Sequence, residues 1–459
     1  MYSDQPFYHA LIIDDQKCIR CTHCLKVCPT EAIRIVDGRV EIKEERCVDC
    51  GECVRACPQK AIGIDHDDLG LLNNFKYRVL LFPSVFFAQF PERLSEDQLY
   101  TALMKLGFTH AYEVEQPITV LKELIRKTVK DNTSPFPTIS SFCPAIVRLI
   151  QSQYPSLTSY IAKVKAPHDL AAHYILDNLS AQGIDPAEVG LFYVTPCVAK
   201  IAAVRKPVGE TKSIISGVVS PGELYNKVMA IIDDIEPADC SEFRKELTKE
   251  GIQWSLTHGE TWWQNSKTMA ADGIHNAIKM LERIENEEIE NIDFLELRAC
   301  DRSCAAGVLL TQNRFLTVQR LKSRARRFPS AEKKMQAEAN NPFEHLEFKV
   351  ITDEILPRPL QRFGPDIAKA ITRMQRARSI MCHLPAIDCG ACGAPTCQAL
   401  AEDMANGKAR MSDCIFIQQL WQKDKKVPPE KAFQRMEKKW GEKRFDPDCT
   451  KIGAKNESN

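Results

Sequence analysis

Cysteine is the residue type whose number and spacing suggest chemistry in this chain of 459 residues, which contains 19 cysteines. Eight of them form two runs of one pattern near the start of the chain. In each run three cysteines are separated by two residues, and a fourth precedes a proline. The runs are Cys18, Cys21, Cys24 and Cys28-Pro29, then Cys47, Cys50, Cys53 and Cys57-Pro58. Clustered cysteines in a reducing compartment bind metals or do redox chemistry, so the runs predict metal sites.

The two runs resemble the bacterial two-cluster ferredoxin, in which the cysteine before proline reaches the other [4Fe–4S] cluster. That resemblance implies one ligand set of Cys18, Cys21, Cys24 and Cys57 and another of Cys47, Cys50, Cys53 and Cys28. Zinc is the alternative, but zinc sites usually use pairs of cysteines without a third at the same spacing. Residues 31–35 and 60–64 repeat a short helix end and strand after each run, which favours a pseudo-symmetric unit.

A third compact group lies near the other end of the chain and consists of Cys389, Cys392, Cys397 and Cys414. Gly390 and Gly393 allow the backbone to fold tightly around a cluster. Residues 398–406 predict a helix that Gly407 ends, so that Cys414 can return as the fourth ligand. The group resembles the small [4Fe–4S] domain of Rnf-type and acetyl-CoA-pathway proteins, and a zinc site is the alternative.

Four isolated cysteines occur in the middle of the chain: Cys143, Cys197, Cys300 and Cys304. The first three follow strand candidates at 137–140, 189–194 and 294–299. Strands that alternate with helices indicate α/β units with parallel sheets, and ligands bind at the carboxyl edge of such sheets. We therefore expect the four thiolates to meet at one buried point. Unrelated core cysteines are the alternative, because free cysteine is commonly buried.

The segments around these cysteines resemble the three signatures of [FeFe]-hydrogenases. Residues 140–145 (Ser-Ser-Phe-Cys-Pro-Ala) match Thr-Ser-Cys-Cys-Pro, residues 195–200 (Thr-Pro-Cys-Val-Ala-Lys) match Met-Pro-Cys-x-x-Lys-x-x-Glu, and residues 296–304 match Glu-x-Met-Ala-Cys-x-x-x-Cys. The resemblance implies that the four cysteines bind the cubane of the H-cluster and that Cys304 bridges to its diiron subsite. It also implies that Lys200 hydrogen-bonds a cyanide of that subsite. With the cluster groups at both ends, the resemblance covers residues 1 to about 425.

The same segments depart from the family pattern around the diiron subsite. Phe142 replaces the proton-relay cysteine, and a phenyl ring has no ionisable proton for acid–base transfer. Thr195 and Arg298 replace methionines of the diiron pocket, and Ala203 replaces a glutamate. A buried arginine is costly unless it is paired, and such neighbouring groups commonly change metal affinity or activity by about 10–100-fold. We expect intact cubane ligands without fast hydrogen turnover, as in the sensory variants of the family.

Composition limits the remaining classes. The 61 basic residues balance 61 acidic ones, which removes the electrostatic footprint of a nucleic-acid-binding protein. The hydrophobic fraction of 44% is sufficient for a buried core. No apolar run reaches 18 residues, and residues 1–10 lack the pattern of a signal peptide, so we expect a cytoplasmic protein without a membrane span.

The predicted fold is an α/β hydrogenase-like core of parallel sheets with helices, flanked by a small α+β ferredoxin domain and a small α-rich C-terminal iron–sulfur domain. The predicted boundaries are 1–70 for the ferredoxin-like domain, 75–365 for the core, 366–425 for the C-terminal [4Fe–4S] domain and 426–459 for a charged tail.

Our leading hypothesis is an electron-transfer protein with four [4Fe–4S] clusters, two N-terminal, one central and one C-terminal, that senses redox state or hydrogen or serves as an electron-transfer subunit. One alternative is a slow [FeFe]-hydrogenase with a diiron subsite, and another is a zinc-stabilised scaffold without redox activity. The expected partner is a ferredoxin, a flavoprotein, an NADH-oxidising subunit or a signalling protein.

Three cysteines have no partner pattern and are predicted to be ordinary thiols: Cys240, Cys382 and Cys449.

Overall fold

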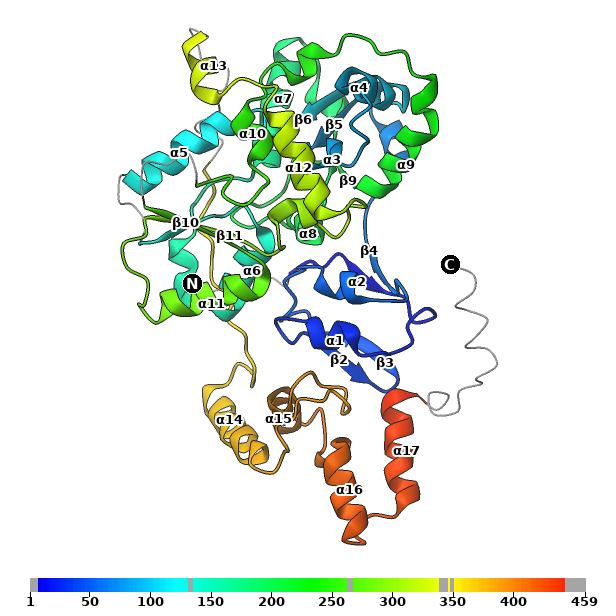
Figure 1. Cartoon of the computed structure of the whole chain (residues 1–459). Helices are drawn as coiled ribbons and strands as arrows, with labels where there is room; N and C mark the ends of the chain where they lie inside the picture. Colours follow the sequence, from blue (N-terminus) through cyan, green and yellow to red (C-terminus); the bar gives the residue numbers. More distant parts are fainter. Residues whose placement is uncertain (1–6, 131–134, 262–266, 338–345, 347–350, 442–459) are drawn as a thin grey trace. The chain divides into compact units, whose positions relative to one another are not determined.

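The computed structural model describes residues 7–130, 135–261, 267–337, 346 and 351–441, without the side chains of 335–337. The chain forms two compact units, whose elements are labelled in Figure 1. The first, here called the core unit, comprises Met1–Leu11, Val48–Gly51 and Ile64–Pro359. The second, here called the end unit, comprises Ile12–Cys47, Glu52–Gly63 and Leu360–Asn459. The N-terminal and C-terminal cysteine groups thus belong to one unit, apart from Cys50.

The larger sheet of the core unit has four parallel strands in the order β6-β5-β8-β9. Their bounds are Tyr77–Phe82 for β5, His110–Glu113 for β6, Val189–Val194 for β8 and Gly217–Val219 for β9. Every residue of β8 is buried, as expected of a parallel strand that is covered on both faces.

Helices cover both faces of this sheet because successive side chains of a strand point to opposite sides. Phe82 and Phe192 pack with α4 and α9, whereas Leu81 and Leu191 pack with α7 and α8. The helices of the core unit are α3 (Ser84–Phe87), α4 (Glu96–Lys105), α5 (Ile118–Lys130), α6 (Pro144–Gln153), α7 (Pro167–Ala181), α8 (Val198–Arg205), α9 (Pro221–Ile231), α10 (Lys249–Gln253), α11 (Ile274–Glu285), α12 (Arg314–Ala325) and α13 (Ala331–Ala337).

A second sheet of the core unit has three parallel strands in the order β10-β11-β7. Their bounds are Thr138–Ile139 for β7, Thr268–Asp272 for β10 and Phe294–Arg298 for β11. The strand candidates at 189–194 and 294–299 are therefore confirmed, the second one residue shorter than predicted. Both strands end just before a cysteine, which is the arrangement that places side chains at the carboxyl edge of a parallel sheet.

The end unit joins a ferredoxin-like part to a helical part. In the ferredoxin-like part each cysteine run contains a short helix and is followed by a strand, so the predicted repeat is present. The elements are β1 (Leu11–Ile13) paired with β4 (Ile62–Ile64), β2 (Ile33–Val36) antiparallel to β3 (Arg39–Ile42), and the helices α1 (His23–Val27) and α2 (Glu52–Ala56). The helical part consists of α14 (Ile367–Met381), α15 (Cys397–Ala405), α16 (Ile415–Lys423) and α17 (Pro429–Trp440).

The predicted fold class is confirmed: the core is α/β with parallel sheets, and it has a small α+β part and a small helical part beside it in the sequence. Of the predicted charged tail, residues 429–440 form α17, and residues 442–459 lie outside the described residues. Within the stretches that the structure describes, no helix is long and apolar enough to cross a bilayer.

Candidate metal centres

The isolated cysteines of the core unit lie where strands end and helices begin. Cys143 follows β7 and is the N-cap of α6, and Cys197 follows β8 and is the N-cap of α8. Cys300 comes two residues after β11, and Cys304 lies in the short 3₁₀ helix Ser303–Ala306. The partial positive charge of a helix N-terminus stabilises a thiolate, so the caps suit metal ligands.

Three of these four thiols are brought together. Burial, followed by the neighbouring thiols Cys143 and Cys304, raises the pKa of Cys197 to about 12. Cys143 and Cys197 also pack against one hydrophobic cluster, and Cys50 of the second N-terminal run packs against the same cluster. Cys300 follows β11, the strand next to β7 in the sheet. The assignment of all four as ligands remains a prediction.

Two cations lie over the aromatic ring of Phe142, at the position that the resemblance gives to a proton-relay cysteine. The Nζ atom of Lys200 lies 4.1 Å from the centre of the Phe142 ring, and the Cζ atom of Arg298 lies 3.8 Å from it. All three side chains are buried. Burial alone would lower the pKa of Lys200, but Tyr193 and the thiols Cys304 and Cys197 raise it above its usual value.

The buried Arg298 is paired, which resolves the cost that its sequence position suggests. Its Nη2 atom lies 2.7 Å from Glu260 Oε2, and its Nε atom lies 3.3 Å from Glu296 Oε1. The Ser140 hydroxyl donates to Glu260 at 2.6 Å, and Glu296 accepts the backbone N–H of Glu260 at 2.8 Å. The sequence did not reveal Glu260, because it belongs to an irregular segment with no motif around it.

A buried acid lies near the same thiols. Glu115 accepts hydrogen bonds from the backbone N–H of Ser84 at 3.0 Å and from the Ser255 hydroxyl at 3.1 Å. Burial, followed by the charge of Glu113, raises the pKa of Glu115 to about 8. The carboxyl is therefore protonated near neutral pH, and no sequence signal pointed to it.

The donor set of the core unit fits a cubane. Four thiolates are the ligands that a [4Fe–4S] cluster takes. Cys304, the bridging position of the resemblance, instead packs against a hydrophobic cluster that contains Phe142 and Trp254. Phe142 in turn contacts both Lys200 and Arg298.

The thiols of the first N-terminal ligand set lie close together in the end unit. The pKa of Cys24 is raised to about 11, mainly by burial. The charges of the nearby thiols Cys18 and Cys21, and also of Cys57, raise it further. These are the four cysteines that the ferredoxin resemblance groups. For the second set, burial and then Cys28 raise the pKa of Cys53 to about 12.

The two cysteines before proline have equivalent surroundings. The backbone N–H of Ala32 donates to Cys28 Sγ at 3.2 Å, and that of Ala61 donates to Cys57 Sγ at 3.2 Å. Hydrogen bonds to sulfur are among the factors that set cluster potentials. The equivalence supports the exchange of one cysteine between the two halves of the ferredoxin-like part.

The C-terminal group gathers around the start of α15. Cys397 is its first residue, Thr396 caps it by accepting the N–H of Ala399 at 3.0 Å, and Cys414 is the N-cap of α16. Burial, with Cys389 and Cys414 among the further causes, raises the pKa of Cys392 to about 11. The predicted helix 398–406 is thus confirmed within one residue at each end.

Both glycines of this loop adopt left-handed backbone conformations, with φ +75° at Gly390 and φ +82° at Gly393. Among the remaining cysteines, Cys240 is buried beside Thr101, Cys382 is exposed, and Cys449 lies outside the described residues.

Comparison with known proteins finds three family models along the chain. Residues 10–58 match the 4Fe-4S dicluster domain, residues 81–260 match the C-terminal domain of the iron-only hydrogenase large subunit, and residues 384–416 match a putative Fe-S cluster domain. The chain is 24% identical over 231 residues to iron hydrogenase 1 of Clostridium pasteurianum, across 48% of this chain and 38% of the relative. It is 29% identical over 221 residues to the periplasmic [Fe] hydrogenase large subunit of Nitratidesulfovibrio vulgaris, across 43% and 52% of the two chains.

A further relative is the NADP-reducing hydrogenase subunit HndD of Solidesulfovibrio fructosivorans, 24% identical across 42% of this chain and 32% of that protein. The matches thus span about a third to a half of the length of these relatives. Among solved structures, a variant of [FeFe]-hydrogenase HydA1 from Chlamydomonas reinhardtii gives a TM-score of 0.49 at 16% identity, over 64% of this chain and 98% of that chain.

Proposed function

We propose that this chain is an electron-transfer protein with four [4Fe–4S] clusters. It is similar to [FeFe]-hydrogenases, with a match to a dicluster domain before the hydrogenase match and a match to a putative Fe-S cluster domain after it. Two clusters would be held by the N-terminal cysteine runs, one by the C-terminal group and one by the four isolated cysteines. The central cluster would act as a relay or sensor of redox state or hydrogen, without fast hydrogen turnover.

The contact of Phe142 with both Lys200 and Arg298 is the observation that carries this proposal. It occupies the neighbourhood of Cys304 with a ring and two cations, while leaving the cysteines available to a cubane. A phenyl ring cannot shuttle protons, which removes the acid–base step that hydrogen turnover needs at this position.

A [4Fe–4S] cluster bound here would supply one-electron redox chemistry. The surrounding residues would tune it. Lys200 and Arg298 place positive charge within reach of Cys304 in a buried site, where charge interactions are strong. Glu260 and Glu296 fix the guanidinium of Arg298 in place. Positive charge favours the more negative, reduced form of a cluster.

The proposed partner is a redox protein, such as a ferredoxin, a flavoprotein or an NADH-oxidising subunit, or a signalling protein. A cytoplasmic location fits clusters that need a reducing compartment and remains a prediction.

Anaerobic purification followed by iron and sulfide analysis tests the proposal. We expect about sixteen irons per chain, because each of four cubanes contributes about four. A protein that carries only zinc would refute it.

The second candidate is a slow [FeFe]-hydrogenase, which the burial of Lys200 near Cys304 favours. Infrared spectra of protein produced with the hydrogenase maturation system separate the two candidates. Bands from CO and cyanide ligands would support the hydrogenase, and their absence together with four cubanes would support the relay or sensor.

A further inference from the structure

Two segments more than 350 residues apart in sequence pack together within the end unit. The backbone N–H of Ile35, in β2, donates to the carbonyl oxygen of Gly393 at 2.8 Å. A Cβ atom on Gly393 would lie 2.4 Å from the carbonyl oxygen of Ile35, so only glycine permits this approach. A Cβ atom on Gly390 would lie 3.3 Å from Leu25 Cδ2 in α1. The glycine loop of the C-terminal cysteine group therefore rests directly on the ferredoxin-like part.

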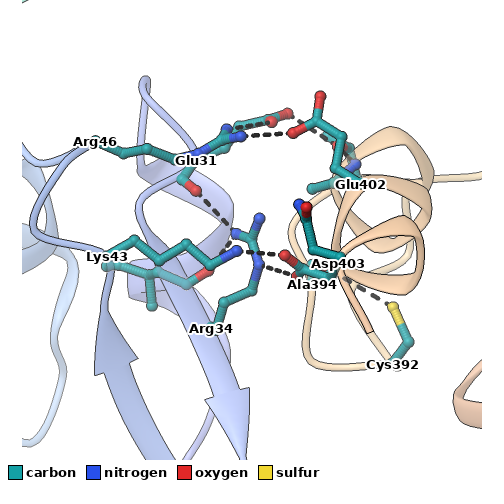
Figure 2. A network of polar contacts seen from close by, with 12 residues as sticks. Glu31, Arg34, Lys43, Arg46, Cys392, Ala394, Glu402 and Asp403 are labelled. Atoms are coloured by element: carbon teal, nitrogen blue, oxygen red, sulfur yellow. Dashed lines mark hydrogen bonds and ion pairs between the residues drawn. The ribbon is translucent and has the colours of Figure 1, made fainter. Parts of the chain in front are cut away.

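Buried ion pairs hold this contact in one geometry. Arg34 Nε lies 2.5 Å from Asp403 Oδ2, and Lys43 pairs with the same carboxylate. Arg46 Nη2 lies 2.5 Å from Glu402 Oε2. Figure 2 shows these basic side chains of the ferredoxin-like part reaching toward the carboxylates of α15. Burial would raise the pKa of Asp403, but Arg34 and Lys43 lower it below its usual value.

These pairs are too buried to form and break as an exposed docking contact does. Removing one partner of a buried pair leaves an uncompensated charge, which is strongly destabilising. The Thr396 hydroxyl adds a hydrogen bond to Glu31 at 2.9 Å, and the indole N–H of Trp440 donates to the carbonyl oxygen of Ala391 at 3.0 Å. The C-terminal cysteine group is thus a permanent neighbour of the ferredoxin-like part.

The contact joins residues that adjoin proposed ligands on both sides. Leu25 directly follows Cys24, and Gly390 directly follows Cys389. Leu25 is fully buried, and its side chain lies against Gly390 at this point.

We infer that the C-terminal cluster exchanges electrons directly with the ferredoxin cluster held by Cys24, across the contact of Leu25 with Gly390 and of Ile35 with Gly393. The inference rests on the proposed function, because both groups must hold clusters. One electron leaves one cluster and enters the other, so that one is oxidised as the other is reduced and no further reactant is needed. Cys389 is exposed, which gives the C-terminal cluster a second face toward a redox partner.

Spin–spin interaction in the EPR spectrum of the reduced full-length protein tests this direct electron exchange between the two clusters. With both clusters reduced, we expect the ferredoxin signal to be broadened by the C-terminal cluster. In Cys397→Ala, which removes a C-terminal ligand, the broadening should be lost while the ferredoxin signal remains. A protein with about sixteen irons and no spin–spin interaction would overturn the direct electron exchange alone. A protein without clusters would overturn the proposed function as well.

Gly393→Ala tests the route itself, since the added methyl group must push the loop away from Ile35. We expect the interaction to weaken or disappear with the iron content retained, and an unchanged interaction would overturn the route. Gly63→Ala is the matched control in the same unit, because its added atom would come no closer than 3.8 Å to a neighbour. Its spin–spin interaction and iron content should equal those of the natural sequence.

Discussion

The end unit and the core unit offer cysteines to clusters in two different ways. In the end unit each proposed ligand set comes mainly from one short loop, shaped by residues such as Gly390 and Gly393. In the core unit Cys143, Cys197 and Cys300 follow separate strands of two sheets, and the first two cap different helices. The first kind of site depends on local chain conformation and the second on the whole fold, so the two should respond differently when the metal or a neighbouring charge is removed.

The two units also differ in how they balance charge. In the end unit the cations Arg34 and Lys43 are matched to a carboxylate in the contact between its two parts. In the core unit Arg298 is also paired with carboxylates, but it and Lys200 lie close enough to the Cys304 thiol to act on its charge. Charge therefore fixes geometry in one unit and can set cluster potential in the other.

Removal of iron should have the largest effect, and mainly on the end unit. The hydrophobic cluster of its helical part includes Cys392, Cys397 and Cys414, and so small a core needs metal to stay folded. Hydrogen exchange after anaerobic chelation should show protection lost in α15 and α16 and retained in β5 and β8. Reconstitution with iron and sulfide is the control and should restore protection. Equal loss in both units would contradict the distinction.

Loss of one central ligand should remove one cluster and leave the others. For Cys197→Ala we expect about four fewer irons per chain, because a cubane lacking a ligand is not retained. Cys240→Ala is the control, since that buried thiol lies beside Thr101 and belongs to no proposed ligand set. Iron analysis of both variants measures this difference, and Cys240→Ala should keep the iron content of the natural sequence. An unchanged iron content in Cys197→Ala would show that the isolated cysteines hold no cluster.

Loss of a core cation should change a potential without changing the iron content. Lys200→Met removes positive charge near Cys304, so the reduced central cluster loses stabilisation and its potential falls. We expect a decrease of about 59 mV, which corresponds to a tenfold change for a one-electron couple. Redox titration followed by EPR measures this potential. In Lys200→Arg, which keeps the charge, the potential should fall less than in Lys200→Met. A potential that is the same in Lys200→Met as in the natural sequence would argue against charge tuning.

The smallest expected effect is a pH-dependent band from Glu115, whose raised pKa contrasts with the lowered pKa of Asp403 in the end unit. The folded chain holds a proton on Glu115 that an unfolded chain, with a pKa of 4.5, releases. The stability that this proton brings is present below about pH 4.5 and is lost as the pH rises through about 8.

Infrared difference spectra should show a carboxylic acid band at about pH 6 that disappears by about pH 9. Glu115→Gln should lack it. Persistence of the band in that variant would assign it to another group.

Local patterns predicted much of the fold. The apolar run at 189–194 is β8, and the glycine at 407 follows α15 as expected. Cysteine spacing likewise predicted the grouping of Cys18, Cys21 and Cys24, which lie together. In each case the information is carried by a few neighbouring residues, so the sequence contains it.

The long-range partners could not be predicted in the same way. Arg34 and Asp403 are 369 residues apart, and neither has a motif that marks it as buried. The sequence marked Arg298 as an unusual residue. It did not identify the partner Glu260, because the two residues meet only in the folded protein. Such pairs depend on tertiary packing, which a single sequence does not specify by spacing.

Anomalous diffraction at the iron edge from anaerobic crystals would test most directly whether the distributed cysteines hold a cluster. We predict one compact group of iron atoms in the core unit that contacts the sulfur atoms of Cys143, Cys197, Cys300 and Cys304. Iron confined to the end unit, with those four sulfur atoms bound to nothing, would contradict it.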